Sequence, residues 1–338
     1  MPQLRQNIIT GEWVVFAPER AKRPTDYISV SAERTQKKED CPFCIDSKKS
    51  EYEKRIKEHD GPYTYVITNK YPAFVEDQSR CVAASYKVED DFYKMRLSLG
   101  GHDVVVIKNH DLDLPDFSNA VWEDMFRAFK ERYQYFKTLC NVEYVMPIYN
   151  HGPQAAASIE HPHAQIFAST IIPNIIFREL SHTANYYTDH HECAFCAMID
   201  HERDQNVRTL FENEDFIAFN FYAARFPFEA WILPKRHMSQ FVDLKPKEME
   251  NLSAICRQVF KRLDEVLNDP PVNFFLHSAP TDSMGRNLSY YHWHLEVAPR
   301  LSLYGGFELG SGVTIDIIAP EQAAEYLRLG RTTRARKS

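Results

Sequence analysis

The sequence has no apolar run long enough to cross a membrane, and its N-terminus lacks the hydrophobic segment of a signal peptide. It also lacks a strong charge of either sign, because 40 basic and 47 acidic residues leave a formal net charge of −7. A charge of this size argues against a general nucleic-acid-binding protein. We therefore expect a soluble, cytoplasmic protein with neither nucleic-acid nor membrane partners.

Disulfides are also unexpected, although the chain contains seven cysteines. Four of them form two C-x-x-C pairs, Cys41–Cys44 and Cys193–Cys196. In a cytoplasmic chain of 338 residues, such pairs favour metal binding. The isolated cysteines are expected to pack in the core, and they are Cys81, Cys140 and Cys256.

One order of features occurs twice: a C-x-x-C pair, an aromatic stretch, a strand ending in histidine, a long amphipathic helix and a His-x-His segment. These features stand at 41–44, 69–74, 102–110, 118–139 and 161–163, and again at 193–196, 221–228, 229–237, 247–267 and 292–294. The repeat predicts an α+β fold with two tandem units, each an antiparallel sheet plus a long helix, related by a pseudo-two-fold axis. We place the units at 1–185 and 186–338.

Each C-x-x-C pair has two histidines at equivalent places in its copy of the repeat. Structural zinc is commonly bound by two such thiolates and two imidazoles, which leaves no open position for substrate. Buried thiols without metal are the alternative, and a redox pair is disfavoured because no thioredoxin-like βαβ pattern surrounds either motif. The predicted zinc ligands are Cys41, Cys44, His110 and His161 in one site, and Cys193, Cys196, His237 and His292 in the other.

The segment His161-Pro162-His163-Ala164-Gln165 is suited to covalent catalysis on phosphorus. Imidazole is a good nucleophile near neutral pH and can form a covalent intermediate. A glutamine amide is an uncharged donor for a developing phosphoryl oxyanion. On a strand, His163 and Gln165 would point to the same face.

Together these motifs resemble the galactose-1-phosphate uridylyltransferase family of the histidine-triad superfamily. The resemblance covers nearly the whole length: Thr10 to Pro24, CPFC, HPHAQ, the strand ending in PKRH, HWHLE, and Gly305 to Gly312 occur in the family's order. It implies two tandem histidine-triad-like units and a two-step transfer. His163 would attack the α-phosphorus of a nucleotide sugar, and hexose 1-phosphate would leave. A second hexose 1-phosphate, or inorganic phosphate, would then accept the nucleotidyl group.

The resemblance also implies roles for other residues. Gln165 would stabilise the intermediate, and His161 would bind zinc beside the nucleophile. The family is dimeric, so we expect a homodimer in which 305–312 reach across the interface. His102 and His151 are taken as ordinary strand or surface histidines. The positions that match substrate contacts of the family are Arg20, Arg23, Phe43, Asn69, Asn150, Ser158, Phe307 and Glu308.

The activity has alternatives. We expect a UDP-glucose:hexose-1-phosphate uridylyltransferase, in which galactose is inferred from the larger branch of the family. The segment GHDVVV and the second C-x-x-C pair are also similar to the ADP-glucose phosphorylase branch, which transfers an adenylyl group to phosphate. A dinucleotide polyphosphate hydrolase and a zinc-stabilised module that binds nucleotides without turnover are further alternatives.

The second metal site also has an alternative. Some family members bind this metal through a glutamate and three histidines, and the matching residues here are Glu179, His277, His292 and His294. We favour the two cysteines. His294 is the repeat equivalent of His163, but Leu295-Glu296 follow it, so we take it as non-catalytic.

Overall fold

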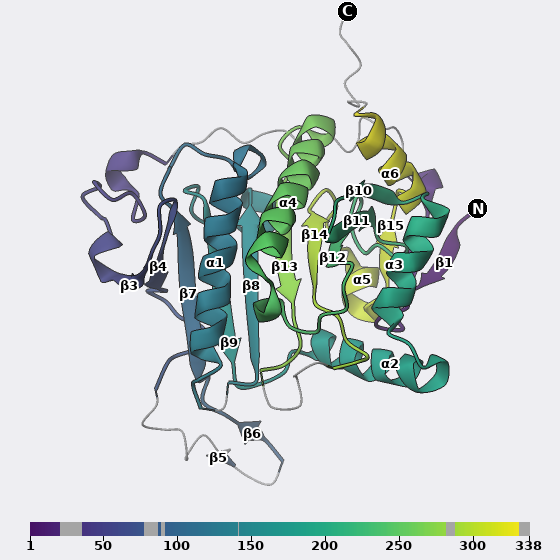
Figure 1. The fold of residues 1–338 in the computed structure, drawn as a ribbon, viewed down its shortest axis with the longest axis horizontal. Helices are drawn as coiled ribbons and strands as arrows, with labels where there is room; N and C mark the ends of the chain where they lie inside the picture. The colour runs from purple at the N-terminus through teal and green to yellow at the C-terminus, as the bar shows by residue number, and fades with distance from the viewer. Residues whose placement is uncertain (21–35, 78–86, 89–91, 141, 282–287, 331–338) are drawn as a thin grey trace, which may run out of the picture.

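The computed structural model describes residues 1–20, 36–77, 87–88, 92–140, 142–281 and 288–330. Arg23 and Cys81 lie outside these ranges. The described residues form a mixed α+β fold around a ten-stranded sheet in which all neighbouring strands are antiparallel (Figure 1). From one edge to the other, its strands are β10 (Thr209–Glu212), β11 (Phe216–Asn220), β12 (Ala230–Pro234), β14 (His294–Pro299), β13 (Val272–His277), β8 (Tyr144–His151), β9 (His163–Ser169), β7 (Gly100–Ile107), β4 (Thr64–Thr68) and β3 (Arg55–Asp60).

The two copies of the repeat meet at β8 and β13, where Ile148 lies opposite Phe275. Gln165 of β9 lies opposite Ile148, and Glu296 of β14 lies opposite Phe275. Gln165 and Glu296 therefore occupy equivalent positions about an axis between the central strands. The predicted fold class is confirmed, with one continuous sheet shared by both units.

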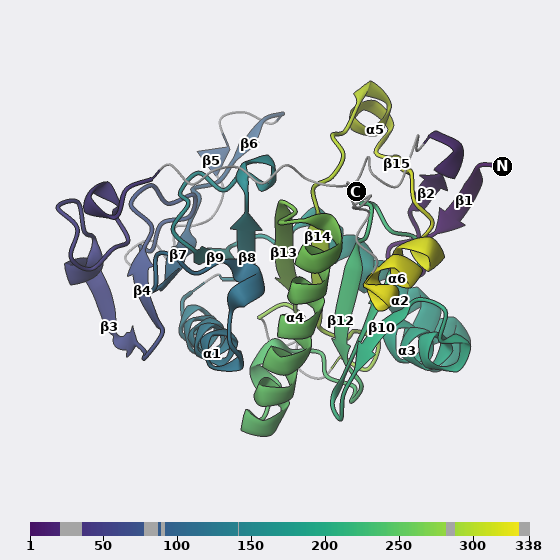
Figure 2. The same cartoon turned by 90° about the horizontal axis from the view of Figure 1, so that it is seen from above.

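Two long helices, α1 (Asn119–Phe136) and α4 (Pro246–Leu267), cover one face of the sheet (Figures 1 and 2). Both fall within or close to the segments predicted to be helical. Their apolar faces pack around Trp122, whose ring lies 5.1 Å from that of Phe260 on α4 and 5.8 Å from that of Phe274 on β13. This shared core joins the two units.

Successive side chains of β9 point to opposite faces of the sheet. Ala164, Ile166 and Ala168 lie in the core beneath the helices. His163 and Gln165 therefore point to the opposite face. The predicted nucleophile and its glutamine thus lie on the face that α1 and α4 leave uncovered.

On the C-terminal half, this second face is covered by elements from both ends of the chain. The strands β1 (Gln3–Gln6), β2 (Trp13–Phe16) and β15 (Thr314–Asp316) form a small sheet, and residues from β2 share a hydrophobic cluster with α3 (Ala194–Gln205) and β11. The helix α2 (Asn174–His190) precedes α3, and the unit boundary placed at 185/186 falls inside α2. Residues 1–16 therefore pack with the C-terminal half.

The remaining elements are short. They are α5 (Gly306–Ser311), α6 (Pro320–Leu329), the hairpin β5 (Lys87–Val88) and β6 (Lys94–Met95), and the 3-10 helices η1 (Pro18–Arg20), η3 (Lys38–Asp40), η4 (Tyr52–Lys54), η6 (Leu114–Asp116), η7 (Pro153–Ala155) and η8 (Phe241–Asp243). Among the described residues, no helix has the length and apolar character needed to span a membrane.

The sequence predicted core packing for the isolated cysteines. This prediction is confirmed for Cys256, which is fully buried. It is wrong for Cys140, which is exposed in the turn after α1 and is disulfide-bonded.

Candidate active site and metal centres

The strand β9 positions the predicted nucleophile between two neighbouring strands. Val106 of β7 lies opposite His163, and the backbone N–H of Ile107 donates to the carbonyl of Pro162 over 3.0 Å. The hydrogen-bonded pairing of β7 with β9 therefore begins beside the HPH segment and fixes its backbone. This places His163 at the end of a central strand, where its side chain is 8% exposed.

Hydrogen bonding assigns different roles to the two ring nitrogens of His163. Its Nδ1–H donates to the carbonyl of His161 over 2.8 Å, which leaves the lone pair of the neutral ring on Nε2. Burial lowers the pKa of His163 and so favours the neutral form. The ring of Phe43 lies beside it, with 5.0 Å between ring centroids. This neutral form, with a lone pair on Nε2, is the form in which a histidine can act as a nucleophile.

Gln165 contacts a histidine that the sequence does not mark as functional. Its Oε1 lies 2.9 Å from Nε2 of His102 on β7, and the Nδ2 of Asn69 lies 3.1 Å from the same nitrogen. The structure therefore brings Asn69 and Gln165 together around His102. The even spacing of His102 from Val104 and Val106 on one strand is the signal that places it on this face.

Asn150 lies on the same face as Gln165. Its Oδ1 accepts from Nδ2 of Asn273 over 2.8 Å, and Asn273 also donates to the carbonyl of Ala155 over 2.8 Å. With its oxygen engaged, Asn150 keeps its amide protons for another acceptor. Ser158 is exposed in the loop between η7 and β9, and Arg20 ends η1.

Phe307 and Glu308 lie on α5, which stands out from the sheet (Figure 2). The side chain of Phe307 is 55% exposed. Glu308 accepts from the backbone N–H of Gly305 over 2.9 Å and so caps its own helix. Among the described residues, no hydrogen bond or ring contact links either side chain to His163.

The first predicted zinc ligands converge on one point. Cys41, Cys44, His110 and His161 offer ligand atoms that lie within 4.8 Å of one another. Cys44 Sγ lies 3.2 Å from Nδ1 of His110, and Cys41 Sγ lies 3.4 Å from Nδ1 of His161. These separations are close to the roughly 3.3–3.8 Å expected between ligands around tetrahedral zinc.

The surroundings of this group also fit a cation. Nε2–H of His161 donates to the carbonyl of Ile107 over 2.6 Å, so its Nδ1 presents a lone pair to the cysteines. Burial, and then the neighbouring Cys41, raise the pKa of Cys44 to about 12. A bound cation would favour the two thiolates that burial otherwise opposes.

The second predicted group is assembled in the same way. Cys193, Cys196, His237 and His292 also lie within 4.8 Å of one another. Cys196 Sγ lies 3.4 Å from Nδ1 of His237 and 3.7 Å from Nδ1 of His292. A hydrogen bond from Cys196 lowers the pKa of Cys193 to about 3. Both groups can therefore hold a metal ion with ligands of the type that zinc prefers.

The alternative ligand set for the second metal is divided between two places. His292 belongs to the cysteine group, whereas Glu179, His277 and His294 form a separate buried group with Glu296. In this group His277 Nδ1 lies 2.9 Å from Glu179 and 3.4 Å from Glu296. Burial opposes the charge of His277, but the two carboxylates raise its pKa. The cysteine and glutamate sets are therefore neighbours rather than competitors.

The surroundings of His294 do not suit a nucleophile. Its ring lies 5.0 Å from Phe195, which matches the contact between His163 and Phe43. However, Trp231 stacks on His294 at 4.6 Å, and the ring is fully buried. Glu296, which replaces the glutamine, pairs with Arg225. The second copy of the site is filled by its own side chains.

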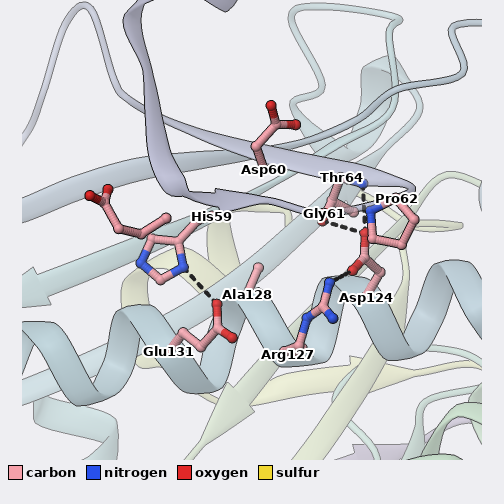
Figure 3. A pocket seen from close by; sticks show the side chains of 10 residues that line it. His59, Asp60, Gly61, Pro62, Thr64, Asp124, Arg127, Ala128 and Glu131 are labelled. Atoms are coloured by element: carbon pink, nitrogen blue, oxygen red, sulfur yellow. Dashed lines mark hydrogen bonds and ion pairs between the residues drawn. The ribbon is translucent and has the colours of Figure 1, made fainter.

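A separate pocket of about 280 Å³ lies between the β3–β4 turn and α1 (Figure 3). The carboxylate of Asp124 accepts from the backbone N–H groups of Tyr63 and Thr64, each over 2.8 Å, and His59 pairs with Glu131 at 2.6 Å. None of the predicted site residues lines this pocket, whose walls are Glu58, His59, Asp60, Gly61, Pro62, Thr64, Asp124, Arg127, Ala128 and Glu131.

Known proteins share this organisation. An ADP-glucose phosphorylase from Arabidopsis thaliana is 32% identical over 332 residues, which cover 97% of this chain and 92% of that protein. A galactose-1-phosphate uridylyltransferase from Thermotoga maritima is 26% identical over 336 residues, which cover 97% and 98%. The crystal structure of an ADP-glucose phosphorylase from A. thaliana with bound ADP-glucose has a TM-score of 0.80 at 29% identity, covering 97% of this chain and 99% of that one.

Two family models match consecutive parts of the chain. The N-terminal domain of galactose-1-phosphate uridyl transferase matches residues 1–173, and the C-terminal domain matches residues 179–335. The first match contains His163 and the first cysteine–histidine group, and the second contains the other group. Because the two matches together span nearly the whole sequence, this chain belongs to the galactose-1-phosphate uridyl transferase family.

Proposed function

We propose that this protein is a nucleotidyltransferase that acts on nucleotide sugars through a covalent nucleotidyl-histidine. The observation that carries the proposal is the tautomer of His163, whose Nδ1–H donates to the carbonyl of His161 and whose Nε2 keeps its lone pair. A neutral imidazole fixed in this way needs no general base, because it has no proton to lose before it attacks.

In the first step, Nε2 of His163 attacks the α-phosphorus and forms an N–P bond. The P–O bond to the leaving hexose 1-phosphate breaks, and its electron pair leaves with that oxygen. The amide protons of Gln165 donate to a non-bridging oxygen as charge develops. In the second step, a phosphate oxygen of the acceptor attacks the same phosphorus and releases His163.

The expected donor and acceptor are UDP-glucose and hexose 1-phosphate. This activity is supported by the 26% identity to the T. maritima uridylyltransferase over nearly the full length of both chains. A second candidate is ADP-glucose phosphorylase, in which inorganic phosphate accepts an adenylyl group. The 32% identity to the A. thaliana enzyme favours it, as does the presence of the second cysteine–histidine group.

We also propose that zinc occupies the two cysteine–histidine groups in structural roles. The first would hold Cys41 and Cys44 against the strands that carry His110 and His161. The second would hold Cys193 and Cys196 beside His237 and His292 in the C-terminal half. Each group offers four ligands, so neither is expected to bind substrate.

A homodimer is the assembly that the position of α5 supports. The helix stands out from the sheet, and Phe307 and Leu309 on it are more than half exposed, as is Leu303 in the segment before it. If Phe307 and Glu308 contact substrate, as their match to the family implies, we propose that they do so in a partner copy. Light scattering of the protein in solution tests this assembly.

Mass spectrometry after brief incubation with UDP-glucose or ADP-glucose, without acceptor, tests the proposed function. The digest must avoid acid, since acid hydrolyses the N–P bond of a phosphoramidate. A UMP adduct on the His163 peptide is expected for a uridylyltransferase, and an AMP adduct for a phosphorylase.

The matched variants are His163→Ala and His151→Ala. His163→Ala should form no adduct while it keeps its zinc and its fold, whereas His151→Ala should be labelled like the wild type. If zinc-containing wild-type protein forms no adduct with either sugar nucleotide, covalent transfer is excluded. Hydrolysis or simple binding would then be the better account.

A further inference from the structure

The proton position of His102 is determined by the partner of its Nδ1, which can only donate. The backbone N–H of Ala73 donates to Nδ1 of His102 over 3.1 Å, so this nitrogen carries a lone pair. The single proton of the neutral ring is therefore on Nε2. Burial lowers the pKa of His102, and a second proton on Nδ1 would face the Ala73 N–H. Both effects maintain the neutral Nε2–H form.

This Nε2–H donates to Oε1 of Gln165 over 2.9 Å. Asn69 does not accept that proton, because its Oδ1 accepts from the backbone N–H of Tyr71 over 2.9 Å. The group of Asn69 that lies 3.1 Å from Nε2 of His102 is therefore the Nδ2 donor, and this contact is not a hydrogen bond. The ring of His102 is further held by stacking on Phe167 at 4.0 Å. His102 is thus a fixed donor aimed at one end of the Gln165 amide.

The amide group of Gln165 is planar, so the position of its oxygen also determines the position of its nitrogen. With Oε1 engaged by His102, the two protons on Nε2 of Gln165 remain for another acceptor. His163 lies two residues along the same strand, on the same face. The amide therefore presents donors rather than an acceptor beside the nucleophile. A flipped amide would direct its oxygen at the developing negative charge and repel it.

We propose that His102 is a positioning residue that fixes the Gln165 amide with its N–H groups toward the phosphoryl oxygens. The proposal rests on the function proposed above and names a residue that sets the orientation of its oxyanion donor. His102 does not touch the reacting atoms, and its neutral ring takes no proton during the reaction.

Two conservative variants separate the contacts of His102. In His102→Gln, the amide nitrogen can take the place of Nε2 and donate to Gln165. In His102→Asn, the shorter side chain can take the place of Nδ1 and accept from Ala73, but it does not reach Gln165. A purely structural role would favour the Asn variant, because it keeps the backbone contact. The proposed role requires the Gln variant.

The test is the single-turnover rate of nucleotidyl-enzyme formation, with whichever sugar nucleotide labels the wild type. We expect His102→Asn to lower this rate by about 10- to 100-fold, approaching the loss caused by removing one oxyanion donor. His102→Gln should remain within about threefold of wild type, and KM should change little in either variant. In a Gln165→Ala background, His102→Asn should have no further effect.

Three results would overturn the proposal. His102→Asn could match the wild type in rate, it could lower the rate equally with and without Gln165, or the wild type could form no adduct. The last result defeats the proposed function as well, whereas the first two leave it standing. As a readout without substrate, nitrogen NMR of histidine-labelled protein should place the His102 proton on Nε2. A proton on Nδ1 would contradict the assignment.

Discussion

At the scale of single residues, the reactivity of this site depends on which nitrogen carries each proton. A carbonyl determines the tautomer of His163, and a backbone N–H determines that of His102. The sequence predicted that His163 and Gln165 lie together, because residues two apart on a strand share a face. It did not predict His102, since only the register of β7 against β9 brings His102 to Gln165 across 63 positions.

The depressed pKa of His102 predicts a pH-dependent contribution to stability. An unfolded chain protonates this histidine near pH 6.5, whereas the folded chain resists protonation until a lower pH. Below pH 6.5 the unfolded state therefore binds more protons, and stability falls until the folded pKa is reached. His102→Gln lacks this dependence. Urea unfolding at pH 7.5, 6.5 and 5.5 should show wild-type stability falling more steeply than that of the variant, and parallel curves would contradict the prediction.

At the scale of helices and strands, the spacing of apolar residues correctly predicted the two helices, α1 and α4, that cover one face of the sheet. Both long helices follow from apolar residues at helical spacing, and Ser118 begins α1 by accepting from the backbone N–H of Val121. The close packing of α1 on β7 was not predictable in this way. It depends on Gly101, where an added Cβ would lie 2.0 Å from Cε1 of Phe136.

Gly101→Ala should therefore push α1 away from β7. We expect a loss of about 1–3 kcal/mol in the free energy of unfolding, which is typical of overpacking in a core. Gly310→Ala is the matched control, because a Cβ at Gly310 would meet nothing within 4 Å, and its effect should stay within about 0.5 kcal/mol. Urea denaturation measures both, and equal stability of the two variants would disprove the close-approach argument.

At the scale of the whole molecule, the repeat predicted the doubled architecture and the two cysteine–histidine groups. It did not predict that the units would share one sheet, or that β1 and β2 would pack on the C-terminal half. Pairing between residues near opposite ends of a chain leaves no local pattern in the sequence. The third buried group was also only partly predicted, because Glu296 joins it through strand register rather than through a motif.

Metal binding by the cysteine groups should contribute to global stability. Cys44→Ser should lower the zinc content by one ion per chain and cost several kcal/mol, since structural zinc in small domains supplies about 10 kcal/mol or more. Cys256→Ser is the control: it places a hydroxyl in the core, where Cys256 is fully buried, but it should leave the zinc content unchanged. Elemental analysis and urea unfolding of the same samples distinguish the two. Undiminished zinc in Cys44→Ser would argue against the assigned ligands.

The pairing of β2 with β15 has a consequence for synthesis on the ribosome. Val14 lies beside Thr314 in the parallel pair, so the first strands of the chain cannot complete their sheet until almost all of the polypeptide has been made. At ordinary translation rates this delay is roughly 15–60 s. During that time the N-terminal segment is available to chaperones, and its docking is expected to be among the last events of folding.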